Sequence, residues 1–290
     1  MIEKIWVETE AWIIDQNGNA LFTTEIAGKQ IKIFDLIFDN SPKGLQEHMK
    51  PEIFSNMVEL FTGAGNVESI KKEAAQLREW LEETTNKLWL ILSRNSVYPV
   101  NISNRDWVLS REEIYKESFD RVRKLNPDVE FGARTLWLHV HMSCITDQAT
   151  MDLLFSLNNF YADIWLNDES ENRLSNPNIL MSKERFKIRK PLVETRNKLW
   201  EKHGWFFPIK FNTKTDLFET FFAKDITNIS GDENIPNLIE SHRIITLKKP
   251  GEQFTVEDRH ADCPSDAKKI TQSIDIIINN AKQALNKNSL

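Results

Sequence analysis

The order of the predicted elements favours an α+β fold with a mainly antiparallel sheet. Segments in which apolar and polar residues alternate, as in strands, occur in runs that tight turns connect. Segments with apolar residues three or four positions apart, as in helices, separate those runs. Strands joined by tight turns pair antiparallel, whereas a parallel sheet needs long crossover connections. We expect the 290 residues to form a single domain, 1–290, with enough chain for a buried core.

The first predicted strand, residues 5–13, carries an unusual pair of carboxylates. Its alternation places Glu8 and Glu10 on one face, between Trp6 and Trp12. Glutamate is depleted in strands, and two carboxylates on one strand face repel each other. A cation between them would offset that repulsion. The alternative is a strand with one solvated face, which is the common explanation of an isolated Glu-x-Glu.

Two turns continue the N-terminal part of the sheet. The turn Asp-Gln-Asn-Gly at 15–18 leads to a second strand at about 20–25. Ala27 and Gly28 turn the chain again, into a third strand at 30–34. The three strands together predict an antiparallel meander.

Helical spacing follows in three segments. In 51–62 the apolar positions are Ile53, Met57 and Leu60. The longest amphipathic helix is expected at 66–92, with Asn66 as its N-cap. A shorter helix is predicted at 110–124.

Residues beyond 134 continue the mixture of strands and helices. In chain order we expect a strand at 135–144, a helix capped by Asp147 and running to about Trp165, a charged helix at 182–202, a long loop at 225–242, strands at 243–247 and 253–259, and a final helix that Pro264 opens.

Composition and charge exclude several classes of function. A net charge of −6, with 28% charged and 40% hydrophobic residues, argues against nucleic-acid binding. The densest basic run, 183–190, is interrupted by Glu184, Phe186 and Ile188, which favours a solvated helix face or a local anion site. No apolar run reaches the roughly 20 residues that span a bilayer. Since there is no signal peptide and only Cys144 and Cys263 could pair, we expect a cytoplasmic protein without a disulfide framework.

Four predicted elements each present two polar side chains on one side. Glu8 and Glu10 share a strand face, Glu52 and Glu59 lie two turns apart on a helix, and two further strands carry a His-x-His and a Glu-x-Arg pair. Each pair alone is typical of a solvated surface, and a surface Glu-x-Arg ion pair contributes little. Together they indicate a polar cavity above a sheet. Carboxylate oxygens suit Mg²⁺ or Mn²⁺, and an arginine beside them would balance phosphate charge.

These pairs, in this order, resemble motifs of the glutamate–cysteine ligase superfamily, in its bacterial carboxylate–amine ligase branch. The motifs are Trp6-Val-Glu-Thr-Glu10, Glu52-Ile-Phe-Ser-Asn-Met-Val-Glu-Leu60, His139-Val-His141 and Val256-Glu-Asp-Arg-His-Ala-Asp-Cys-Pro264. The likeness covers most of residues 3–266, and the last motif is the most specific. It implies a glutamine-synthetase-like fold, in which a curved, mainly antiparallel sheet forms a cavity and helices pack on its outer face.

The resemblance also implies an ATP- and Mg²⁺-dependent ligase that joins a small-molecule carboxylate to an amine through an acyl phosphate. Five glutamates would hold two or three Mg²⁺ ions, or Mn²⁺, on the phosphates of ATP: Glu8, Glu10, Glu52, Glu59 and Glu257. The nucleotide would contact His139, His141, Lys248 and Arg259. Arg259, His139 and Glu257 would carry the catalysis, while His141 and Arg173, in the loop 173–178, would contact substrate.

Several positions depart from the family pattern. The leading glycine is Trp6, a histidine is replaced in the segment beginning at Ser96, and two expected arginines are Asn176 and Lys248. The metal and phosphate groups are kept while substrate-side groups differ, so we expect substrates other than glutamate plus cysteine. A phosphotransferase of related fold and a catalytically silent Mg·ATP-binding protein are the alternatives. The sequence leaves open the substrates, the pathway and whether the chain forms a homo-oligomer.

Overall fold

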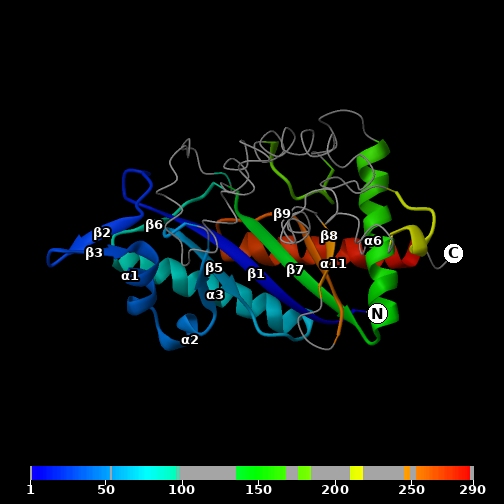
Figure 1. Ribbon diagram of the computed structural model, residues 1–290, viewed down its shortest axis with the longest axis horizontal. Coiled ribbons are helices and arrows are strands. Elements are labelled where there is room, and N and C mark those ends of the chain that lie inside the picture. Colours follow the sequence, from blue (N-terminus) through cyan, green and yellow to red (C-terminus); the bar gives the residue numbers. More distant parts are fainter. Residues whose placement is uncertain are drawn as a thin grey trace, which may run out of the picture. The chain divides into compact units, whose positions relative to one another are not determined.

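The structure, a computed structural model, describes residues 2–52, 54–95, 97, 135–167, 176–183, 210–217, 245–248 and 253–287 (Figure 1). The chain divides into two compact units. Unit 1 comprises Met1–Ile5, His139–Ala261 and Ile274–Leu290, and unit 2 comprises Trp6–Leu138 and Asp262–Ser273. That 1–290 is one functional domain stays a prediction.

The sheet of unit 2 is built on the N-terminal strand. Strand β1 (Ile2–Ile14), which begins in unit 1, pairs antiparallel with β5 (Met57–Phe61), and β5 pairs antiparallel with β4 (Met49–Pro51). The short strand β6 (Ile91–Leu92) pairs with the end of β1. The predicted strand at 5–13 is therefore confirmed. Its alternate positions from Ile5 to Ile13 are buried, and Glu10 and Trp12 on the other face are buried as well.

Helix α3 (Val67–Lys87) confirms the predicted amphipathic helix of unit 2, although it ends five residues earlier than expected. The Asn66 side chain caps it by accepting a hydrogen bond from the Ser69 amide over 3.0 Å. Its buried stripe includes Ile70, Ala74 and Leu77. The core of unit 2 joins α3 to the sheet and to two short helices, α1 (Ile33–Asn40) and α2 (Lys43–Gln46).

Two predictions for the N-terminal segment are wrong, the second only in part. Residues 51–62 do not form a helix: a turn closed by the Met57 amide on the Phe54 carbonyl precedes strand β5. The run Met-Val-Glu-Leu at 57–60 is buried on both faces of the strand, so its apolar residues do not alternate as they would in a half-exposed strand. Of the expected meander, the second and third strands are present and pair antiparallel, as β2 (Thr23–Ile26) and β3 (Lys29–Lys32). They form a separate two-stranded ribbon and do not extend the sheet of β1, and Ile33 already begins α1.

Unit 1 contains the strand order β7–β9–β8. Strand β7 (Trp137–Cys144) and strand β9 (Thr255–Asp262) confirm two predicted strands, and β8 (Ile245–Lys248) pairs antiparallel with β9. Helix α6 (Asp147–Asn167) packs against β8, and α11 (Ala267–Lys287) passes from unit 2 into unit 1. The cap of α6 is Thr146, whose hydroxyl accepts from the Ala149 amide. Asp147 instead accepts a hydrogen bond from the Phe254 amide.

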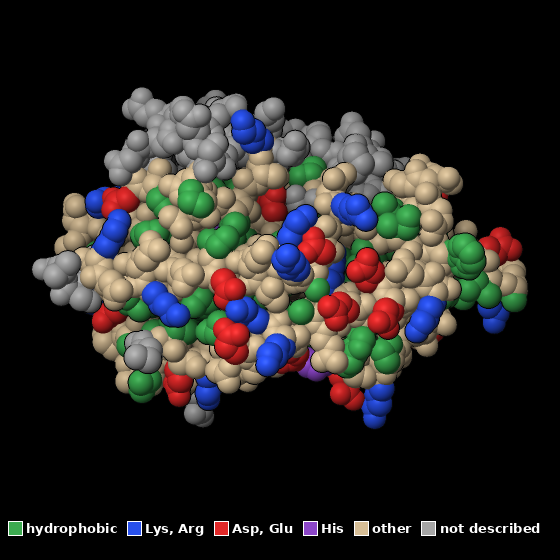
Figure 2. Space-filling model, turned by 180° about the vertical axis from the view of Figure 1, so that it is seen from behind, with side chains coloured by type: hydrophobic (Ala, Val, Ile, Leu, Met, Phe, Trp, Pro, Cys, Tyr) green, Lys and Arg blue, Asp and Glu red, His purple; other side chains and the backbone are tan. Residues whose placement is uncertain are grey.

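The observed elements confirm an α+β fold with a mostly antiparallel sheet. The predicted elements at 110–124 and 225–242, and 182–202 apart from Ser182 and Lys183, lie outside the described residues. No helix in the described part of the chain is long and apolar enough to cross a membrane. On the face drawn in Figure 2, acidic and basic side chains lie interspersed, so exposed charge does not mark the functional site there.

Candidate functional site

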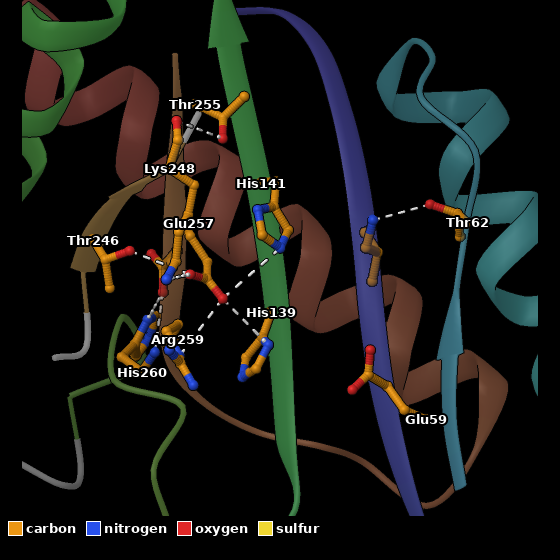
Figure 3. A network of polar contacts seen from close by, with 12 residues as sticks. Glu59, Thr62, His139, His141, Thr246, Lys248, Thr255, Glu257, Arg259 and His260 are labelled. Atoms are coloured by element: carbon orange, nitrogen blue, oxygen red, sulfur yellow. Dashed lines mark hydrogen bonds and ion pairs between the residues drawn. The ribbon is translucent and has the colours of Figure 1, made fainter. Parts of the chain in front are cut away.

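The Glu257 carboxylate is the centre of a buried polar group in unit 1 (Figure 3). Glu257 and Arg259 project from one face of β9 because they are two residues apart in a strand. Thr246 lies directly opposite Glu257 on β8, and its hydroxyl donates to Glu257 Oε2 over 3.2 Å. The residue is only 3% exposed, so its charge has to be balanced by protein groups or by a ligand.

Four basic side chains surround this carboxylate. The Arg259 Nε and His139 Nδ1 atoms lie 3.6 and 3.4 Å from Glu257 Oε1. His141 Nε2 lies 3.8 Å from the same oxygen, and Lys248 Nζ lies 3.9 Å from Oε2. The two histidines alternate on β7, the strand next to β9, which is why both reach one carboxylate. We call these five residues the Glu257 group.

Electrostatics in the Glu257 group favour the ionised carboxylate. Burial raises the pKa of Glu257, but the charges of Arg259, His139, His141 and Lys248, in that order, outweigh it. The pKa falls from 4.5 to about 2. Because several basic groups converge on a single carboxylate, the group has an excess of cationic and hydrogen-donating atoms. Such an excess suits the oxygens of a phosphate.

A second polar group, in unit 2, follows a straight line across three strands. Lys50 on β4 lies opposite Glu59 on β5, and Glu59 lies opposite Glu10 on β1. Directly opposed residues share one face of a sheet, so these three side chains share it, and Glu8 lies two residues from Glu10 on the same face. Glu52 adds a fourth carboxyl by hydrogen bonding to Glu59. We call these five residues the acidic row.

Glu59 is the most perturbed carboxyl group of the acidic row. Its pKa lies well above the usual value because burial, the hydrogen bond to Glu52 and the charges of Glu8 and Glu52 all disfavour ionisation. Lys50 opposes them, with its Nζ 2.6 Å from Glu59 Oε1. The concentration of carboxylates fits the oxygen ligands that a hard divalent cation prefers. At Glu59 Oε1, however, a protein cation is already present.

Glu10 has a structural role in addition to its place in the acidic row. Its Oε2 accepts a hydrogen bond from the Trp137 amide over 2.7 Å. Its carbonyl accepts from Arg78 Nη1 over 3.4 Å, and Arg78 Nε also donates to the Ser265 carbonyl over 3.2 Å. Arg78 is 1% exposed. A buried arginine of α3 therefore holds the backbone of β1 at the position from which Glu10 projects.

Besides Lys50, reasoning from sequence missed Arg78 and a second group of polar residues. Arg78 follows Ala74 by four positions and so lies on the apolar stripe of α3, which is the only signal of its burial. The second group lies on the opposite face of β9, where Asp258 accepts from the Tyr161 hydroxyl over 2.8 Å and contacts His260 Nδ1 over 2.5 Å. Asn280 donates to the same Tyr161 oxygen over 3.1 Å. These contacts join residues up to 119 positions apart, and no local sequence pattern predicts them.

The structure thus collects the predicted site residues into two groups. The Glu257 group contains His139, His141, Lys248, Glu257 and Arg259, and the acidic row contains Glu8, Glu10, Glu52 and Glu59 together with Lys50, which was not predicted. The joining of the two groups into one site stays a prediction. Arg173 and Ser96 lie outside the described residues. Cys144 and Cys263 are buried and form no disulfide, and burial raises the pKa of Cys263 to about 11.

Comparison with solved structures shows which known proteins have a similar fold. The chain is similar to a bifunctional glutathione synthetase from Pasteurella multocida, with a TM-score of 0.54 and 10% sequence identity. The match covers 98% of this chain and 41% of that chain, so the chain spans about two fifths of the length of that enzyme. A glutamate–cysteine ligase from Francisella tularensis, solved in complex with AMP, matches over 98% of this chain and 70% of that one, at 13% identity and a TM-score of 0.45. No protein-family model and no curated protein matches the sequence. The first match confirms the kind of fold that the sequence motifs predicted.

Proposed function

We propose that the chain is an ATP- and Mg²⁺-dependent ligase that joins a carboxylate to an amine through an acyl phosphate. The observation that carries the proposal is the Glu257 group, in which Arg259, Lys248, His139 and His141 converge on one buried carboxylate. Cationic groups held in place by a buried counter-charge can stabilise a phosphoryl group in transfer. The presence of a separate row of carboxylates supports the second requirement, divalent cations.

The residues of the Glu257 group would have distinct roles. Arg259 would neutralise charge on the phosphoryl group as it moves to the substrate carboxylate, because its planar guanidinium binds two oxygens at once. His139 and Lys248 would bind and orient other phosphate oxygens. Glu257 would orient Arg259 and His139 through the contacts described above. His141, whose Nε2 lies 3.8 Å from Glu257 Oε1, would contact the substrate as well as the nucleotide.

The acidic row would supply carboxylate oxygens for Mg²⁺, as would Glu257. When bound, Mg²⁺ would neutralise phosphate charge. The protein residues themselves need no nucleophile, because the substrate carboxylate attacks the γ-phosphorus and the amine then displaces phosphate. This matches a site of carboxylates, imidazoles and a guanidinium, with both described cysteines buried elsewhere.

A substrate panel tests the proposed function. Purified protein is incubated with Mg²⁺, ATP and pairs of carboxylates and amines, and ADP release is measured together with product mass. We expect ADP only when both a carboxylate and an amine are present, and a product whose mass is that of the two substrates less water. A stable phosphorylated product without an amide would instead indicate a phosphotransferase. Binding of Mg·ATP without turnover on any pair would indicate a silent homologue.

A further inference from the structure

Arg259 lies where β9 runs past its described pairing with β8. The antiparallel register joins residues 255–258 of β9 to β8. In the described part of the sheet, this ladder holds the backbone at Glu257 and stops one residue before Arg259. The direction of the Arg259 side chain therefore depends on what else fixes the backbone around it.

The two neighbours of Arg259 in the chain are bonded to each other. Asp258 Oδ1 accepts a hydrogen bond from the His260 backbone amide over 3.2 Å, and it lies 2.5 Å from His260 Nδ1. Each contact spans Arg259, so each closes a ring of atoms that contains the Arg259 backbone (Figure 3 labels Arg259 and His260). A ring of this kind restricts the φ and ψ angles of the residue inside it, as an Asx turn does.

Two helices of unit 1 hold the Asp258 carboxylate in place. Its Oδ2 accepts from the Tyr161 hydroxyl of α6 over 2.8 Å. The Tyr161 oxygen accepts in turn from Asn280 Nδ2 of α11 over 3.1 Å. Tyr161, Asp258, His260 and Asn280 are all fully buried. Water therefore does not compete for these hydrogen bonds, and the low local dielectric strengthens them.

The surroundings of His260 decide which of its ring nitrogens carries the proton. Nε2 is buried and has no hydrogen-bond partner in the parts of the chain that the structure describes. The Tyr161 ring lies against the imidazole, with 4.6 Å between the ring centres. A proton on Nε2 would be a buried donor without an acceptor, which is costly, whereas a proton on Nδ1 points at the Asp258 carboxylate.

We propose that Asp258 and His260 are positioning residues that fix the direction of Arg259, with the imidazole protonated on Nδ1. Asp258 accepts hydrogen bonds from Tyr161 and from both donors of His260. The Arg259 Nε atom is thereby kept 3.6 Å from Glu257 Oε1. The inference rests on the proposed function for the claim that this direction matters to phosphoryl transfer.

NMR of the intact protein tests the inference without any need for turnover. With ¹⁵N-labelled histidine, the unchanged protein should show His260 protonated on Nδ1 and unprotonated on Nε2. His260→Gln places its amide near the former Nε2 and loses the bond to Asp258, so the Arg259 Nε–H should exchange with solvent about tenfold faster. His260→Asn keeps a donor at the position of Nδ1, so this exchange should stay close to that of the unchanged protein.

The two variants separate positioning from packing. Glutamine is closer than asparagine to histidine in size, so a merely structural role predicts that His260→Asn is the more disruptive change. His48→Gln is the matched control, because it removes the 2.9 Å contact of His48 Nδ1 with the Phe61 carbonyl in unit 2. It should leave the exchange of the Arg259 Nε–H unchanged.

A double-mutant cycle on turnover shows whether His260 acts through Arg259. His260→Gln should lower kcat for ADP release by about 10–100-fold, since a displaced guanidinium no longer meets the transferring phosphoryl group. In the Arg259→Ala background the same change should have no further effect, because the group that it positions is already absent. A further loss of kcat in that background would overturn the inference.

The NMR outcomes also decide the inference. A His260 proton on Nε2 overturns it, as does Arg259 exchange in His260→Gln equal to that of the unchanged protein. If His260→Gln does not fold, slow Arg259 exchange in His260→Asn together with the Nδ1 proton supports the inference, and fast exchange or unfolding of both variants overturns it. Failure of the proposed function is separate: without ADP release from any substrate pair, the proton position and the exchange rates still decide whether Asp258 and His260 fix Arg259.

Discussion

The Tyr161 hydroxyl donates a hydrogen bond to Asp258 Oδ2 over 2.8 Å, on the face of β9 opposite Glu257 and Arg259. Both partners are fully buried. Burial and the neighbouring Asp258 charge raise the pKa of Tyr161 well above its usual value, so the hydroxyl stays a donor. Strand β9, which carries the proposed site residues Glu257 and Arg259, is therefore anchored on its opposite face by the buried hydrogen bond from Tyr161 to Asp258.

Tyr161→Phe should lower the free energy of unfolding by about 1–3 kcal/mol, because a buried carboxylate loses a donor. Urea denaturation measures the change. Ser55→Ala is the control, since it removes the hydrogen bond from the buried Ser55 side chain to the Phe22 carbonyl in unit 2. If Tyr161 positions β9, Tyr161→Phe should also lower kcat for ADP release, whereas Ser55→Ala should affect stability alone. An equal effect of both variants on kcat would contradict that role.

Arg259→Ala should reduce kcat for ADP release by about 10²–10³-fold, because a charge that stabilises the transferring phosphoryl group is lost. Arg259→Lys should recover little of the loss, since an ammonium group cannot bind two oxygens in a plane. Lys210→Ala is a suitable control, because Lys210 pairs with Asp163 at an exposed position. Turnover of Arg259→Ala near that of the unchanged protein would count strongly against the proposed function.

Glu257 should make stability depend on pH in a defined window. The pKa of Glu257 is about 2 in the folded protein and 4.5 for an ordinary glutamate. Its contribution to the free energy of unfolding is therefore fully present above pH 4.5 and is lost as pH falls toward 2. At neutral pH this contribution is about 3 kcal/mol. Glu257→Gln should therefore be less stable than the unchanged protein at pH 7, and the difference should shrink below pH 4.5. A difference that is constant from pH 7 to pH 3 would be inconsistent with the Glu257 group.

Arg78→Met should destabilise the protein by about 2–4 kcal/mol, because the buried Glu10 carbonyl and the partly buried Ser265 carbonyl each lose a donor. Denaturant unfolding gives this value directly. Arg94→Met, at an exposed position of unit 2, serves as the control and should change stability by less than about 0.5 kcal/mol. Arg78→Met with the stability of the control would show that the guanidinium contributes nothing to holding β1.

The parts of the fold that sequence reasoning predicted correctly are those with a clear local period. Strand β1 alternates over nine residues, and α3 combines a buried stripe with the Asn66 cap, so neither depends on distant partners for its identification. The segment 51–62 lacked such a signal. In β5 both faces are buried, so the apolar residues do not alternate, and their spacing matched a helix by coincidence.

The site residues likewise divide into those with a local sequence signal and those that only the fold brings together. Glu8 and Glu10, His139 and His141, and Glu257 and Arg259 were predicted in pairs, because neighbours two apart in a strand always share a face. Lys50 was not predicted, since its contact with Glu59 depends on the pairing of β4 with β5. Because residues 51–62 were predicted as a helix, this strand pairing was not expected. Tyr161 and Asp258 are 97 residues apart, and only the packing of unit 1 brings them together.

The most direct test of the proposed ligase follows one oxygen atom. A carboxylate substrate found in the panel is labelled with ¹⁸O in its carboxyl group and incubated with the protein, ATP, Mg²⁺ and the amine. If the carboxylate attacks the γ-phosphorus and the amine then displaces phosphate, one labelled oxygen must appear in the released phosphate. Transfer of ¹⁸O into phosphate in step with amide formation is the predicted result, and amide formation that leaves the phosphate unlabelled would contradict the account.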